Sequence, residues 1–180
     1  MTRLAIPDRS AADPKSQPLL AAVEQQLGSV PNLFRLLGLS PAALEGFLGL
    51  SQALNSTLDA KTRERIALAV AQVNGCDYCL SAHTYLAANL AKLDETEIAA
   101  ARHGRSADPR ADAAVSFARL VTETRGHVSD SAIASAKLAG LTEAEIVEIV
   151  ANVAVNVLTN FVNVVAETEI DFPVVRAEAA

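Results

Sequence analysis

The chain has 180 residues, of which 51% are hydrophobic, and its 15 basic and 21 acidic side chains give a formal net charge of −6. A chain of this length buries about 70% of its unfolded surface, so its core closes without a disulfide or a structural metal. The acidic balance, with no basic run interleaved with aromatic residues, excludes nucleic acid as a partner.

The first residues differ in composition from the rest of the chain. Pro7, Pro14 and few apolar positions predict that residues 1–16 form an extended arm, and residues 17–180 a single domain without internal repeats. The start of the chain contains no apolar segment typical of a secretory signal. We therefore expect a cytoplasmic protein that does not bind membranes.

Capping residues, prolines and glycines divide residues 17–180 into consecutive helices. The expected helices are Pro18 to Gly28, a short one from Pro31, Pro41 to about Asn55, Asp59 to Asn74, the cysteines to about Ala91, one after Asp94, Pro109 to about Thr124, Ser129 or Asp130 to Gly140, and one after Thr142. Asp94 with Glu97, and Thr142 with Glu145, are each expected to form a capping box.

The segment from Ile146 to Ala166 is apolar and long enough to cross a membrane, but one Glu and four Asn interrupt it. Its β-branched residues would also suit a buried strand. The preceding capping box and the length favour a buried helix, which completes an all-α fold. The four Asn, at positions 152, 156, 160 and 163, are expected to form hydrogen bonds across a helix seam inside the subunit; the alternative is a seam between subunits.

The chemistry is concentrated around the only two cysteines, Cys76 and Cys79, which follow Gly75 at a predicted helix start. Unsatisfied backbone N–H groups and the helix dipole stabilise thiolates there. His83 lies four residues after Cys79 and thus above it on the same helix face. The helix start alone favours Cys76 as the more acidic thiol, whereas the His83 contact favours Cys79.

Glu64 completes this set if the helices before and after Gly75 pack side by side. A rise of about 1.5 Å per residue puts Glu64 about 15 Å back along the first helix, His83 about 10 Å along the second and Cys79 only about 5 Å. Glu64 is then roughly level with His83. The expected proton relay runs from Glu64 to His83 to Cys79, with Cys76 as the resolving thiol.

The spacing Glu-x11-Cys-x2-Cys-x3-His resembles the redox motif of the alkylhydroperoxidase D (AhpD) family, within the carboxymuconolactone decarboxylase-like superfamily. Four further segments resemble its peroxidase-related subgroup: Val30-Pro31-Asn32-Leu33-Phe34, Asn74-Gly75-Cys76, Thr159-Asn160-Phe161-Val162-Asn163 and Glu169-Ile170-Asp171-Phe172-Pro173. Founding members have His between the cysteines where this chain has Tyr78, which implies a simpler relay and weaker activity.

This resemblance implies an all-α peroxidase, assembled as a trimer or hexamer, that uses neither a metal nor an organic cofactor. It implies that Cys79 attacks hydrogen peroxide or an organic hydroperoxide, becomes a sulfenic acid and condenses with Cys76. It assigns Glu64 and His83 to the proton relay. The reductant that reopens the disulfide is an unidentified dithiol. In well-studied members of the family this reductant is a dihydrolipoyl protein.

Several alternatives stand beside this interpretation. The cysteines can be inert core residues, or can bind zinc with His83 and Glu64. The chain can be a structural module or a decarboxylase-like enzyme on the same scaffold, although decarboxylases of this superfamily lack the Cys pair as a rule. A general disulfide reductase would need an exposed Cys76 or Cys79.

The remaining His and Tyr residues receive structural interpretations. His103 and His127 lie beside Gly104 and Gly126, where capping of helix ends explains them. Tyr78 and Tyr85 are expected to be half-buried with their hydroxyls in water, or to line a pocket mouth.

Overall fold

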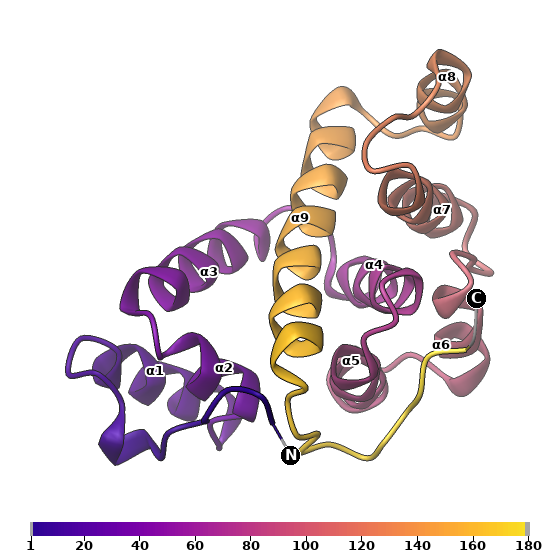
Figure 1. Ribbon diagram of the computed structural model, residues 1–180. Coiled ribbons are helices and arrows are strands. Elements are labelled where there is room, and N and C mark those ends of the chain that lie inside the picture. Colours follow the sequence, from indigo (N-terminus) through magenta and orange to yellow (C-terminus); the bar gives the residue numbers. More distant parts are fainter. Residues whose placement is uncertain (1, 179–180) are drawn as a thin grey trace.

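The computed structural model describes residues 2–178, and within them the regular structure is entirely helical (Figure 1). This confirms the predicted all-α fold. The elements are η1 (Arg9–Ala11), α1 (Gln17–Leu27), α2 (Asn32–Leu37), α3 (Pro41–Leu54), α4 (Ala60–Val73), α5 (Asp77–Asn89), α6 (Glu95–Arg102), α7 (Pro109–Glu123), α8 (Asp130–Leu138) and α9 (Glu143–Ala166).

The predicted caps explain most helix boundaries. The side chains of Ser40 and Asp59 accept hydrogen bonds from the backbone N–H groups three residues on, at the starts of α3 and α4. At the start of α9, Thr142 and Glu145 form the complete capping box. Only half of the capping box predicted at α6 is present. The Asp94 side chain accepts the backbone N–H of Glu97, but the Glu97 carboxylate accepts hydrogen bonds from Arg65 and from the backbone of Ala107.

Helix α4 lies at the centre of the bundle, and α5, α6, α7 and α9 all pack against it (Figure 1). Its central position follows from its sequence, because the run from Arg65 to Ala71 is buried on every side. The small alanines in this run allow the neighbouring helices to approach closely. The long helix α9 also contacts α3, α5 and α7 and so joins the two ends of the molecule.

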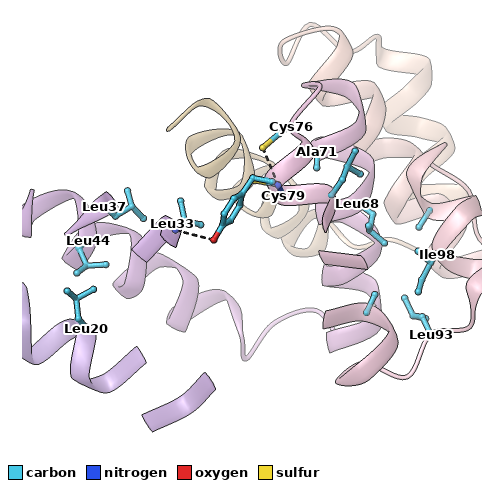
Figure 2. Packing of buried hydrophobic residues seen from close by; sticks show 14 of the residues in the cluster. Leu20, Leu33, Leu37, Leu44, Leu68, Ala71, Cys76, Cys79, Leu93 and Ile98 are labelled. Atoms are coloured by element: carbon cyan, nitrogen blue, oxygen red, sulfur yellow. Dashed lines mark hydrogen bonds between the residues drawn. The ribbon is translucent and has the colours of Figure 1, made fainter. Parts of the chain in front are cut away.

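The buried apolar residues form two clusters. One, with Ile66, Phe117 and Ile149, joins α4, α7 and α9. The other extends from Leu20 and Leu44 near the N-terminus to Leu68 and both cysteines, and Figure 2 shows these residues. The cysteines are therefore part of a hydrophobic core.

Helix α9 is long and apolar enough, by length and composition, to cross a membrane, and it is the one such helix in the described part of the chain. Half of its most apolar window is buried inside the described structure. The prediction of a helix is confirmed, but the helix is not buried all round. Val147, Phe161 and Val165 are more than half exposed.

Residues 167–178 contain no helix and follow the start of α5 after leaving α9 (Figure 1). Ser81 exchanges hydrogen bonds with the backbone of Val175, and Asp77 accepts one from the backbone N–H of Ala177 at 2.8 Å. This tail therefore covers the helix that carries the cysteines.

Candidate active site

The turn between α4 and α5 places the two cysteines differently. Gly75 adopts a left-handed conformation with φ 65°, which reverses the chain at the end of α4. Cys76 is the N-cap of α5, and its Sγ accepts a hydrogen bond from the backbone N–H of Cys79 at 3.3 Å. Cys79 lies inside the first turn of the helix. Both are free thiols, 1% and 2% exposed.

Glu64 and His83 meet across the contact between α4 and α5. His83 Nδ1 lies 2.8 Å from Oε2 of Glu64, and both side chains are about one-fifth exposed. The contact that the rise per residue predicts is therefore present. His83 also follows Cys79 by one helical turn on α5.

A cavity of about 790 Å³ opens beside Cys79. Cys79, His83 and Glu64 line it, whereas Cys76 is not among its lining residues. Most of the remaining wall is apolar or aromatic, with Leu27, Phe34, Phe47, Leu86, Tyr85 and Phe172 among its residues. The space is large enough to hold a small organic molecule against the Cys79 sulfur.

The electrostatics distinguish the two thiols. A hydrogen bond from the Cys76 thiol, the charge of His83 and the amides of Asn163 and Asn160 together lower the pKa of Cys79 to about 6, against the opposing effect of burial. The same hydrogen bond and burial raise the pKa of Cys76. These contacts favour Cys79 over Cys76 as the more acidic thiol, whereas the helix start alone favoured Cys76.

The surroundings of His83 favour its protonated form. Burial acts to lower its pKa, but the neighbouring Glu64 carboxylate outweighs this effect, so that the pKa of His83 is raised. The charge of His83 in turn lowers the pKa of Cys79, as a neighbouring imidazolium does for activated cysteines.

Tyr78 and Tyr85 both line the cavity, as one of the two alternatives predicted, but the expectation that the Tyr78 hydroxyl lies in water is wrong. The Tyr78 side chain is 4% exposed, and its hydroxyl donates to Oδ1 of Asp171 at 2.8 Å and accepts from the backbone N–H of Leu33. Tyr85, which is 44% exposed, packs with Phe172. In the sequence, Asp171 was only one residue of a motif, and no role was assigned to it. Its contact with Tyr78 spans 93 residues, and such a contact leaves no local sequence pattern.

His103 and His127 lie outside this site. His103 caps the end of α6, and its Nε2 lies 3.6 Å from the Glu178 carboxylate. Within residues 2–178, no three His, Cys, Asp or Glu side chains are grouped so that they could hold a metal ion. The donors considered for zinc do not form such a group. Burial of both cysteines also contradicts the interpretation as a general disulfide reductase, which needs an exposed thiol.

The four asparagines of α9 are all at least 92% buried within the single chain. A seam between subunits is therefore the wrong explanation for these amides. Asn152 and Asn156 bond to carbonyls of their own helix, at Glu148 and Asn152. Asn160 and Asn163 instead reach the turn between α4 and α5.

Comparison with known proteins agrees with this fold. Residues 41–124, from α3 to the end of α7, match the model of the Carboxymuconolactone decarboxylase family. An uncharacterised protein of Haemophilus influenzae is 51% identical over 45 residues, which cover 24% of this chain and 40% of that protein.

Solved structures share nearly the whole fold. An uncharacterised peroxidase-related protein with an AhpD core from Ralstonia eutropha is 23% identical, with a TM-score of 0.83 over 94% of this chain and 92% of that one. A peroxidase-related protein from Silicibacter sp. TM1040 is 24% identical, with a TM-score of 0.79 over 93% and 91%. The debrominase Bmp8 is 24% identical, with a TM-score of 0.77 over 94% and 91%.

The family model covers the helices that carry Glu64, the cysteines and His83, and the all-α architecture is that of the AhpD core. The part of this chain that carries the site therefore matches the Carboxymuconolactone decarboxylase family, and the chain shares the fold of solved AhpD-like proteins.

Proposed function

We propose that this protein is a thiol peroxidase that reduces organic hydroperoxides or hydrogen peroxide, with Cys79 as the attacking thiol and Cys76 as the resolving thiol. One observation carries the proposal: the acidic thiol, Cys79, faces a cavity beside the Glu64–His83 pair, and the less acidic Cys76 lies directly behind it. The family whose model matches residues 41–124 is compatible with this activity.

The reaction balances within the site. The Cys79 thiolate attacks one peroxide oxygen, the O–O bond breaks, and the other oxygen leaves as an alcohol, or as water from hydrogen peroxide, after taking one proton. The Cys76 thiol then attacks the Cys79 sulfenic acid, which releases water and forms a disulfide. In total, one hydroperoxide and two thiols give one alcohol, one water and one disulfide.

His83 supplies the proton for the leaving oxygen in this scheme. Its Nδ1 is held by Glu64, so Nε2 is the ring nitrogen left to face the substrate. The carboxylate keeps His83 protonated beside the thiolate, and it stabilises the charge until the proton moves.

The burial of both sulfurs restricts the reductant. Because Cys76 and Cys79 are 1% and 2% exposed, the face of a folded protein cannot meet their disulfide directly. A slender dithiol, such as a lipoyl arm, can instead enter the cavity and attack the Cys79 sulfur. This argument supports a lipoyl protein as the electron donor.

A second candidate is reductive debromination of an aromatic ring. Bmp8 is a debrominase, and a cysteine-to-alanine variant of it has been crystallised with 2,3,4-tribromopyrrole. The aromatic lining of the cavity here, with Phe34, Phe47 and Phe172, favours such a ring as an occupant. The same thiol pair would convert an aryl bromide to the arene, a bromide ion and a proton while it forms the disulfide.

The decisive experiment counts free thiols on reduced protein before and after one equivalent of cumene hydroperoxide, hydrogen peroxide or 2,3,4-tribromopyrrole. The peroxidase proposal expects both thiols to disappear with a peroxide and to return with a dithiol. It also expects Cys76→Ser to trap a sulfenic acid at Cys79, and Cys79→Ser to remain unreactive.

Two results would overturn the proposal. If only the bromopyrrole consumes thiols, debromination replaces it. If no compound consumes them, the thiols have a structural role.

A further inference from the structure

The buried Cys79 sulfur needs hydrogen-bond donors that the proton relay does not provide. A thiolate that is 2% exposed has lost nearly all of its water, and this loss opposes ionisation. Amide N–H groups directed at the sulfur replace those lost water contacts, because hydrogen bonds to an ionised group favour its charged form.

Asn163 makes such a contact. Its Nδ2 donates a hydrogen bond to the Cys79 Sγ at 3.3 Å, across 84 residues of sequence. Asn163 is 3% exposed, so water does not compete with the Cys79 sulfur for this N–H donor. Its amide oxygen makes no hydrogen bond among the described residues, which leaves the contact to sulfur as the reason for its orientation.

Asn160 lies one turn earlier on α9 and is fully buried. Its Oδ1 accepts a hydrogen bond from the Nδ2 of Asn74, at 2.9 Å, and Asn74 is the C-cap of α4 directly before Gly75. Because the oxygen is held, the NH₂ end of this amide has a fixed direction. That nitrogen has no hydrogen-bond partner within the part of the chain described, and the Asn160 amide also lowers the pKa of Cys79.

We propose that Asn163 and Asn160 form an amide pair that stabilises the Cys79 thiolate from the side opposite the substrate, and that Asn74 is a positioning residue for Asn160. Cys79 lines the cavity, whereas neither Asn160 nor Asn163 is among its lining residues. The amides therefore hold the sulfur from the core while the cavity face stays open. This gives a role to Asn74 and to the segment 159–163, which the peroxidase mechanism leaves unused.

The inference deepens the proposed function, because it takes Cys79 as the reactive thiol. Its test is independent of turnover: the rate of alkylation of Cys79 by iodoacetamide is measured against pH, with peptide mass analysis to separate Cys79 from Cys76. The midpoint for the native protein is expected near 6.

Asn163→Leu removes the donor at similar volume and is expected to raise this midpoint by about one pH unit, a tenfold loss of thiolate below the midpoint. Asn160→Leu is expected to raise it by less. Asn152→Leu is the matched control: Asn152 is a buried amide of α9 that lines the cavity, but its Nδ2 bonds to the Glu148 carbonyl and not to the sulfur, so the midpoint should stay unchanged.

A double-mutant cycle tests the positioning role of Asn74, which lies at a partly exposed site. Asn74→Ala is expected to raise the midpoint in the native background and to add nothing to Asn160→Leu. Equal effects in both backgrounds would show that Asn74 acts without Asn160 and would overturn that part of the inference.

Asn163→Asp keeps the shape of the side chain but replaces its N–H donors with a carboxyl group, so the midpoint is expected to rise further than in Asn163→Leu. An unchanged midpoint in folded Asn163→Asp or Asn163→Leu would overturn the inference. A raised midpoint in a protein whose thiols ignore peroxide would support the amide pair and reject the peroxidase.

Discussion

The hydroxyl of Tyr78 donates a 2.8 Å hydrogen bond to Oδ1 of Asp171, 93 residues further along the chain. The other oxygen of this carboxylate accepts the backbone N–H of Asn32 at 2.7 Å, and the Tyr78 hydroxyl accepts that of Leu33 at 3.1 Å. The residue between the cysteines thus ties the start of α2 and the C-terminal tail to the site. Burial raises the pKa of Tyr78, so its proton stays on the hydroxyl.

Tyr78→Phe is therefore expected to destabilise the fold by about 1–3 kcal/mol, because it removes the hydroxyl that pairs with Oδ1 of Asp171 and with the Leu33 N–H. Urea denaturation followed by circular dichroism measures the change. Tyr85→Phe is the control, since Tyr85 is 44% exposed, and it should change the stability by less than about 0.5 kcal/mol. Equal effects of the two substitutions would show that the hydroxyl network contributes nothing.

Local signals made the helices predictable. Caps such as Ser40, Asp59 and Thr142 act within three residues of their own positions, and the structure contains each of them. The proximity of Glu64 and His83 was also predictable, because both helices leave a single tight turn and helical rise sets the levels.

The rest of the site depends on contacts without a periodic signature. Asp171 reaches Tyr78 from a segment without regular structure, and Asn163 reaches Cys79 from the far end of α9. A capping pattern predicted that Glu97 would bond to its own helix, but Arg65 of α4 competes successfully for the carboxylate. Residues that are distant in the sequence make these three contacts. A local sequence pattern does not indicate which distant residues will meet.

Glu97 consequently has a stability role. Its carboxylate accepts hydrogen bonds from Arg65, from the Ser106 hydroxyl and from the backbone N–H of Ala107, which lower its pKa against the opposing effect of burial. Glu97→Gln is expected to cost about 2 kcal/mol near pH 7, because Arg65, 7% exposed, loses its charged partner.

The effect should depend on pH. A carboxyl group whose pKa is lowered by folding stabilises the fold above its unfolded pKa, and this contribution is lost as the pH falls through the folded pKa. The difference in urea stability between native protein and Glu97→Gln should therefore shrink below about pH 4.5. Glu143→Gln, which breaks the exposed pair with Lys137, is the control and should have a much smaller effect. A difference that is constant with pH would contradict this account.

The peroxidase proposal predicts a pH profile for oxidation of Cys79. Because the thiolate is the nucleophile and its pKa is about 6, the single-turnover rate should rise about tenfold per pH unit below 6 and level off above it. Glu64→Gln removes the charge that raises the pKa of His83, so His83 is neutral over more of this range and attracts the thiolate less.

The Glu64→Gln midpoint should thus move to higher pH by about one unit, with a rate loss of about tenfold at pH 6. Quenching the reaction at timed intervals and counting thiols measures both effects. Glu45→Gln alters an exposed carboxylate of α3 and should keep the native profile. A Glu64→Gln profile that matches the native one would remove Glu64 from the relay.

The cavity predicts discrimination by substrate size. Ser51 of α3 is a small residue of the cavity wall, far in sequence from the helix that carries Cys79. Ser51→Phe should fill part of the roughly 790 Å³ and lower kcat/KM for cumene hydroperoxide about tenfold or more, while hydrogen peroxide still reaches Cys79. Ala53→Phe, at an exposed position of the same helix, introduces the same ring away from the cavity. If Ser51→Phe slows both peroxides equally, the cavity is not the path by which the bulky substrate approaches the thiol.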